Sequence, residues 1–200
     1  MSLSACTINA CRYWAAIVLV GPLLGACGDP HMEWTEQVKL QSGEVIVIAR
    51  TAKFSENWVA GGGGGSFNKG MTLHVVQPSK RDNPGVWDAR FVPIVLDRDP
   101  ESGEWFIVAT FFHCDSWYDL GRPKLPYTEY RFRSGRWIQQ PLSEKWIGRA
   151  ANVLPADLSD KAAIAESKPD LSVERKEGIL SSAATSPKFK RVVAAWTTGC

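Results

Sequence analysis

Three Ser-Gly pairs separate apolar segments of strand length, and they constrain the fold of this chain more than any other feature. The pairs are Ser42-Gly43, Ser102-Gly103 and Ser134-Gly135, and each is followed within a few residues by a run of β-branched or aromatic residues. Glycine supplies the positive φ of a tight hairpin turn without steric strain. The sequence therefore predicts three β-hairpins within residues 34–142.

Two further apolar segments, 71–76 and 90–96, are predicted to add strands. Pro93 lies in the second segment and favours an edge strand or a bulge, because proline cannot donate a hydrogen bond to a neighbouring strand. In Tyr130-Arg131-Phe132-Arg133, rings alternate with cations, so we expect the rings to face inward and the guanidinium groups outward. We predict an antiparallel, hairpin-rich sheet, either a partly open barrel or a sandwich.

The character of the chain changes after residue 142. Segments 143–146, 157–166 and 171–184 contain helix formers, and Asp170 is a candidate N-cap of the last one. Apolar residues spread along this region indicate that at least part of it packs on the sheet: Ile164, Leu171, Ile179, Leu180, Val192, Val193 and Trp196. A polar, partly mobile extension is the alternative. The sequence thus predicts an α+β fold with a helical C-terminal region.

The N-terminal residues have the layout of a secretory signal peptide. Arg12 precedes an apolar run over residues 13–24, and the small residues Gly25 and Ala26 lead directly to Cys27. A membrane span needs about 20 apolar residues, more than this run provides. Gly21-Pro22 also interrupts the run, which argues against a membrane helix or a buried core helix.

Leu24-Gly25-Ala26-Cys27 resembles the lipobox of bacterial lipoprotein precursors, and the resemblance covers residues 1–27 only. It implies cleavage after Ala26, diacylglycerol on the Cys27 sulfur and acylation of the new N-terminus. Two or more acyl chains anchor a protein stably. Residues 1–26 are then a signal peptide, 27–33 a lipidated tether, and 34–200 one globular domain (34–142 β-rich, 143–200 mainly helical).

The expected location of this protein follows from the same resemblance. In well-studied members of this class, aspartate directly after the lipidated cysteine retains the protein at the inner membrane. Gly28 holds that position here and Asp29 follows it, which favours the outer membrane, with the protein facing the periplasm.

Two cysteines, Cys114 and Cys200, remain after cleavage and lipidation. An even pair in an oxidising compartment commonly forms a disulfide. The alternative is a buried thiol at Cys114 and a loose terminus at Cys200. Removal of residues 1–26 also takes away Arg12 and leaves 22 basic against 21 acidic residues, a net charge near +1. This balance gives no reason to expect nucleic acid as a partner.

No motif for a cofactor or a metal emerges. The glycine run 61–65 lacks the lysine of a phosphate loop, and a strand-like segment follows it. We interpret it as a mobile loop, or as a flap between Trp58 and Phe67 that orders when a partner binds. His113-Cys114-Asp115 would place His113 and Asp115 on one face if it continued a strand, but no zinc-binding spacing accompanies it.

Two expectations concern catalysis. The acid pairs Asp97/Asp99 and Glu101/Glu104 flank a predicted turn, where solvated carboxylates are expected. The enzyme hypothesis, a hydrolase-like envelope protein, would use His113 and Asp115 facing the glycine run. It requires these groups to converge in a concave pocket.

Aromatic residues provide the remaining candidate site. Eight of the nine tryptophans follow the cleavage site, and most are expected in the core. Those in predicted loops are candidates for stacking on an envelope glycan or for a protein interface, together with nearby aromatics: Trp58, Phe67, Trp87, Trp117 and Tyr118. The sequence therefore favours a non-enzymatic, lipid-anchored binding module. A small inhibitor or immunity-type lipoprotein is a further alternative.

Overall fold

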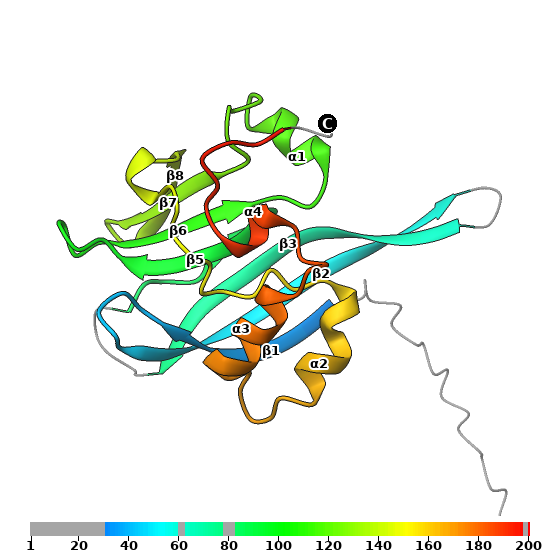
Figure 1. Cartoon of the computed structure of the whole chain (residues 1–200), viewed down its shortest axis with the longest axis horizontal. Helices are drawn as coiled ribbons and strands as arrows, with labels where there is room; N and C mark the ends of the chain where they lie inside the picture. Colours follow the sequence, from blue (N-terminus) through cyan, green and yellow to red (C-terminus); the bar gives the residue numbers. More distant parts are fainter. Residues whose placement is uncertain (1–30, 60–62, 78–82, 198–199) are drawn as a thin grey trace, which may run out of the picture.

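Two four-stranded antiparallel sheets form the body of the protein (Figure 1). The computed structural model describes residues 31–59, 63–77, 83–197 and 200. The strand orders are β1-β2-β3-β4 and β5-β6-β7-β8. The strands are β1 (His31–Lys39), β2 (Val45–Val59), β3 (Gly63–Gln77), β4 (Trp87–Ala89), β5 (Val92–Arg98), β6 (Trp105–Thr110), β7 (Thr128–Arg133) and β8 (Arg136–Pro141). The α+β class is confirmed, and neither sheet closes into a barrel.

All three predicted hairpins are present. The β1–β2, β5–β6 and β7–β8 turns contain Gly43, Gly103 and Gly135, with φ of 88°, 71° and 78°. Ser134 also has a positive φ, of 50°, as the two-residue turn that best fits the twist of a hairpin requires. Both expectations for Pro93 are confirmed, since β5 is an edge strand and its register shifts between Pro93 and Val95.

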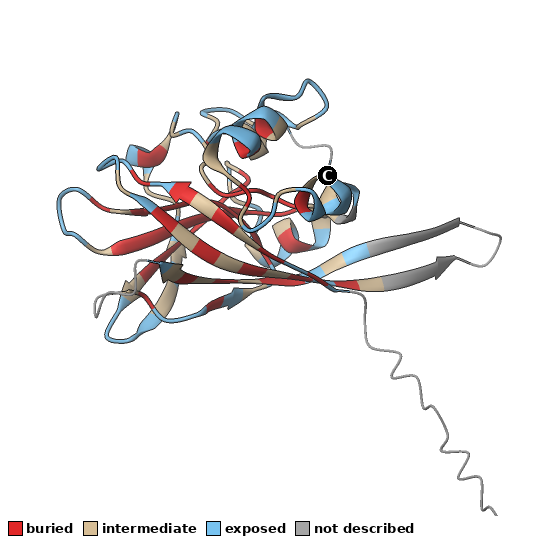
Figure 2. Ribbon diagram, turned by 90° about the horizontal axis from the view of Figure 1, so that it is seen from below, coloured by how far each residue is buried: buried red, intermediate tan, exposed pale blue. Residues whose placement is uncertain are grey.

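The main core lies between the two sheets. The first sheet buries one face, as the alternation of exposed and buried residues along β1 shows. Its buried side chains join those of the second sheet in one cluster, in which Val38, Ile48 and Ile107 are fully buried. The second sheet is covered on both faces, because residues of its other face pack on Trp146 and Val192 of the C-terminal region. Figure 2 shows this concentration of buried residues in the body.

Burial of both faces overturns the expectation for Arg131. Tyr130 faces inward, as predicted, but Arg131 is also buried, on the opposite face. Its guanidinium group forms ion pairs with Asp99 and Glu129. Alternation identifies two faces of a strand but does not reveal that a later segment covers the second face.

The helices are short, and irregular segments join them: α1 (Cys114–Asp119), η1 (Glu144–Trp146), η2 (Leu158–Asp160), α2 (Lys161–Ala165), α3 (Val173–Ser181) and α4 (Pro187–Lys190). The C-terminal region docks on the sheets, as its apolar residues predicted. The predicted Asp170 cap is wrong, because the Ser172 side chain accepts the bond from the Arg175 amide at 3.2 Å. The Asp170 carboxylate instead accepts a hydrogen bond from the Thr35 hydroxyl.

β2 and β3 extend beyond the rest of their sheet as a two-stranded arm, defined here as residues 54–59 and 63–68 (Figure 1). β1 begins opposite Lys53 and β4 pairs only with residues 71–73. The loop expected at 61–65 is wrong for residues 63–65, which pair with 57–59 inside the β2–β3 ladder. Residues 61 and 62 lie outside the described part of the chain.

The N-terminal boundary of the body also differs from the expectation. β1 begins at His31, so residues 31–33 belong to the first strand and not to a tether. The expected signal peptide and Cys27 lie outside the described residues. Among the helices that the structure describes, none is long and apolar enough to cross a membrane.

Candidate functional site

His113, Cys114 and Asp115 do not continue a strand. β6 ends at Thr110 and α1 begins at Cys114. The His113 ring packs edge-on against Phe67 of the arm, with the ring centroids 4.6 Å apart. The Asp115 carboxylate accepts a hydrogen bond from the backbone N–H of Ser116 at 2.7 Å. His113 and Asp115 thus have separate partners, and the described residues contain no group of three or more potential metal-ligating side chains.

The predicted Cys114–Cys200 disulfide is present, with Cα atoms 5.5 Å apart. It ties the end of the chain to the start of α1. The Tyr118 hydroxyl donates to the Cys200 carbonyl at 3.1 Å, and the Trp196 ring packs edge-on against Trp117. The C-terminal segment is therefore held to α1 by covalent, polar and aromatic contacts.

The acids at the β5–β6 turn are not all solvated, which overturns the expectation for Asp97 and Asp99. Each is only 2 % exposed. Asp99 accepts hydrogen bonds from Arg131 at 2.6 Å and from Lys145 at 2.7 Å. Burial alone would raise the pKa of Asp99, but the bonds from Lys145 and Arg131 outweigh it and hold the pKa well below its ordinary value. Asp97 pairs with Arg149, and burial raises its pKa.

The other two acids of this turn also have cationic partners. Glu101 accepts a hydrogen bond from Lys145 at 3.0 Å, and Glu104 accepts two from Arg133 at 2.8 and 2.9 Å. These ion pairs connect β5 and β7 with the segment around η1. We interpret them as structural, because every carboxylate of the group is engaged by a cation of the fold.

A second ion network lies deeper in the protein. Glu36 accepts hydrogen bonds from Arg50 at 2.7 Å and from Lys176 at 3.0 Å, and the backbone N–H of Leu154 adds a third at 3.0 Å. All three charged side chains are at most 2 % exposed. Desolvation lowers the pKa of both Arg50 and Lys176. The network fixes α3 to the first sheet and is enclosed by the core.

The four aromatic candidates whose side chains are described differ in exposure. Trp87 is 1 % exposed and packs edge-on against Tyr130 in the core, which removes it from the candidate binding surface. Tyr118 and Phe67 are 45 % and 39 % exposed. Trp117 is half-buried beside Tyr118 on α1. The side chain of Trp58 is not among those that the structure describes.

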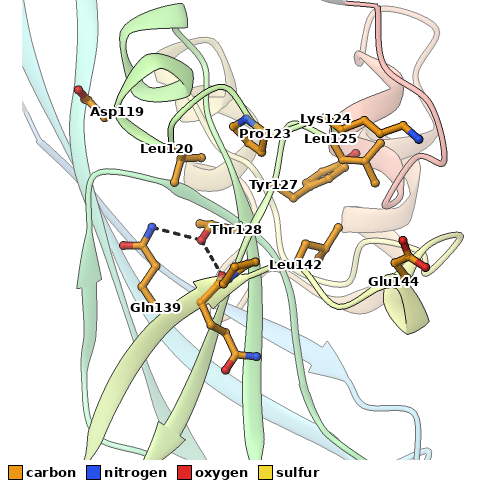
Figure 3. Close-up of a pocket in the computed structure, with 12 residues that line it drawn as sticks. Asp119, Leu120, Pro123, Lys124, Leu125, Tyr127, Thr128, Gln139, Leu142 and Glu144 are labelled. Carbon is orange, nitrogen blue, oxygen red and sulfur yellow. Dashed lines mark hydrogen bonds between the residues drawn. The ribbon is translucent and has the colours of Figure 1, made fainter.

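A hollow of about 600 Å³ lies between the α1–β7 connection and β8, and it is called here the α1–β8 hollow (Figure 3). Apolar and uncharged polar groups form most of its wall, and charged groups lie among them. The lining residues are Asp119, Leu120, Pro123, Lys124, Leu125, Tyr127, Thr128, Gln139, Gln140, Pro141, Leu142 and Glu144. Its volume is within the range of about 300–1,000 Å³ typical of small-molecule sites.

The polar groups of this hollow are arranged by the β7–β8 ladder. The Gln139 amide donates to the Thr128 hydroxyl at 3.2 Å, and that hydroxyl donates to the Gln140 carbonyl at 3.1 Å (Figure 3). Amide groups and hydroxyls offer both donors and acceptors. The leucine and proline side chains beside them give the same hollow an apolar wall.

Tyr127 lines the hollow, but its hydroxyl group already has hydrogen-bond partners in the C-terminal segment. The hydroxyl donates to the Arg191 carbonyl at 2.9 Å and accepts from the Val193 amide at 3.1 Å. Burial raises its pKa to about 12. Tyr127 is therefore neutral at physiological pH and connects the hollow to the C-terminal segment.

Lys188 was not singled out by the sequence. Its ammonium group lies 4.4 Å from the Phe111 ring centroid, near the Phe189 and Trp196 rings, and donates to the Phe111 carbonyl at 2.7 Å. Burial lowers its pKa to about 8. In this segment the sequence indicated only that the apolar residues Val192, Val193 and Trp196 would pack on the sheet.

The sequence predicted the strands that carry Thr128 and Gln139 but not the hollow. Its other wall begins at Asp119, the last residue of α1, and continues along the irregular connection 120–125, whose path is set by contacts distant in sequence, such as the disulfide at the start of α1. Comparisons of the chain with protein-family models, with curated proteins and with solved structures give no match.

Proposed function

We propose that this protein is a lipid-anchored, periplasm-facing envelope protein that binds an uncharged, hydroxyl-rich ligand of the glycan class. The observation that carries the proposal is the α1–β8 hollow, in which hydrogen-bonding amides stand beside an apolar wall. A sugar ring has both hydroxyl groups and an apolar C–H face. Such a ligand matches both kinds of wall.

Two features support the location. The Leu24-Gly25-Ala26-Cys27 motif supports lipidation at Cys27, and the Cys114–Cys200 disulfide is the type of bond that an oxidising compartment maintains. The outer membrane remains the favoured membrane because Gly28 follows the cysteine.

An exposed and a half-buried aromatic residue support the ligand class. Tyr118 and Trp117 lie on α1, and the next residue of the same helix, Asp119, lines the hollow. Aromatic rings on the same short helix offer a surface on which a sugar ring can stack. The rival hydrolase hypothesis has less support, because His113 and Asp115 have separate partners and neither lines the hollow.

The experiment is co-sedimentation of the full-length lipoprotein, kept in detergent micelles, with purified peptidoglycan sacculi. We expect the wild type to sediment with the sacculi and the Gln139→Ala variant to lose at least fivefold in affinity. Gln77→Ala is the matched control, since Gln77 is an exposed glutamine at the end of β3 and does not line the hollow.

Urea unfolding midpoints of the three proteins must agree within error, so that lost binding is not lost folding. The proposal is contradicted if the wild type stays in the supernatant, or if Gln139→Ala and Gln77→Ala bind equally well.

A further inference from the structure

The arm has a fixed direction relative to the start of the described chain. His31 pairs with Lys53, and β2 continues from that point to Val59. Six strand residues span about 20 Å at about 3.3 Å per residue. β1 runs the opposite way from His31, so the body extends about 26 Å, the eight steps from His31 to Lys39, on the other side of His31.

Contacts at its base hold the arm in this direction. Phe54 is 2 % exposed, and Phe67, which pairs with Ser55, places its ring against His113 of the body. Beyond these contacts the two strands pair only with each other within the described chain. Both Figures 1 and 2 show the arm projecting away from the sheets.

The composition of the arm is unusual for a projecting element. Residues 54–68 contain one charged residue, Glu56, whereas surfaces of soluble domains are about a quarter or more charged. An isolated two-stranded ribbon is at best marginally stable in water. A weakly charged ribbon with unpaired edges is therefore expected to lie against another surface.

The length of the chain before β1 limits which surface this is. Three residues, 28–30, separate Cys27 from His31, and the four steps along the chain reach at most about 14 Å. This reach is shorter than the length of about 26 Å by which the body extends from His31 along β1. An arm pointing straight away from the membrane would put about 26 Å of body between His31 and the bilayer, farther than the tether reaches. The remaining orientations place the arm along the membrane or toward it.

We propose that the arm lies against the lipid bilayer beside the anchor, as a second membrane contact that fixes the orientation of the body. This inference rests on the proposed lipidation of Cys27. The contact is interfacial, because unpaired backbone groups at the two edges of the arm need water or headgroups and are not tolerated in hydrocarbon. It depends little on anionic lipid, since the arm carries little charge.

The sequence supplies a probe for this contact. Tryptophan prefers the membrane–water interface, and Trp58 is paired by backbone register with Gly64 in the distal half of the arm. The wild-type lipoprotein is reconstituted in vesicles of phosphatidylethanolamine and phosphatidylglycerol (3:1) that contain brominated phosphatidylcholine as a quencher. Trp58→Phe and Trp137→Phe are compared with it, Trp137 being half-buried on β8.

We expect bromolipid quenching of the tryptophan emission to fall at least twofold in Trp58→Phe and to stay at the wild-type level in Trp137→Phe. The same result is expected in vesicles without phosphatidylglycerol. Equal quenching in Trp58→Phe and the wild type overturns the inference. So does a Trp58 emission that shifts only after an envelope protein extract is added, since this assigns the arm to a protein partner.

Flotation of the vesicles separates this inference from the anchor on which it rests. A wild type that does not float with vesicles after carbonate washing refutes the lipid anchor, whereas a wild type that floats without Trp58 quenching refutes only the arm contact. If Trp58→Phe fails to fold, a variant with residues 56–66 replaced by Asn-Gly is used. Its floating fraction is expected to match the wild type, and its quenching to match that expected for Trp58→Phe.

Discussion

Glu36 is the only acidic member of a buried network that contains two cations, Arg50 and Lys176. Its removal leaves both cations buried without a counter-charge, and breaking a buried pair in this way costs about 3–5 kcal/mol. We therefore predict that Glu36→Ala lowers the free energy of unfolding by about this amount in urea titrations. Glu33→Ala, at an exposed position of the same strand, is the control and should change it by less than about 0.5 kcal/mol. A Glu36→Ala protein as stable as the control would show that the network is not structurally important.

Asp99 makes stability depend on acid pH. Its pKa in the folded protein lies below the value of about 3.9 for an unfolded chain. The folded state therefore binds fewer protons, so the stabilisation by Asp99 is complete above about pH 5 and declines as the pH falls further. We predict that the wild type exceeds Asp99→Asn in urea midpoint at pH 7 and that this lead shrinks at pH 3. A lead that is constant or grows with acidity contradicts the assignment.

The burial of individual charged residues was the least predictable property of this chain. Asp97, Asp99 and Arg131 were assigned to solvent because turn positions and strand alternation normally indicate exposure. Their partners Lys145 and Arg149 lie in a segment that covers the second face of the sheet. Local patterns carry no information on such a cover, which depends on contacts between residues tens of positions apart.

At the scale of elements, turn chemistry was the most informative signal. Each Ser-Gly pair marks an observed hairpin, because a positive φ at the glycine position restricts the turn to few residue types. The loop predicted for the glycine run 61–65 was wrong for residues 63–65. Glycine permits many conformations, so five glycines in succession indicated a loop, whereas pairing with residues 57–59 holds three of them in a strand. One wall of the α1–β8 hollow belongs to the predicted β7–β8 hairpin. The other wall, residues 119–125, was not predicted.

Gly135 and Gly178 differ in backbone conformation, so replacing each with alanine tests the local geometry of the β7–β8 turn and of α3. Gly135 has a φ of 78° in the β7–β8 turn, whereas Gly178 lies inside α3 with open space around an added Cβ. We predict that Gly135→Ala destabilises the protein by about 1–2 kcal/mol, the cost of the left-handed conformation. Gly178→Ala should stabilise it by about 0.4–1 kcal/mol. Thermal or urea unfolding of both variants decides, and equal effects of the same sign would contradict the local geometry.

The disulfide makes α1 and the C-terminal segment one unit. It closes a loop of 86 residues, and by the chain-entropy model its loss costs about 4–5 kcal/mol. We predict that the double variant Cys114→Ser/Cys200→Ser loses stability of this order, and that the wild type shows no free thiol from these two residues before reduction. Reduced wild type is the control and should match the double variant. Unchanged stability would mean that the pairing contributes little to the fold.

At the scale of the whole molecule, the fold places its two proposed contacts on different elements. The arm continues β2 and β3 of the first sheet, and the α1–β8 hollow lies on the second sheet and the α1–β7 connection. The proposed lipidation site, Cys27, lies four positions before His31, which pairs with Lys53 next to the arm. An arm that lies on the bilayer would hold the body in one orientation and so fix where the hollow faces.

The most direct test of this account is the intact mass of the protein purified from the membrane fraction of cells that express the full chain. We predict a mature protein that begins at Cys27 and carries acyl chains, and a Cys27→Ser variant that remains an unlipidated precursor. A membrane-fraction protein with an unmodified N-terminus at Met1 would contradict the account.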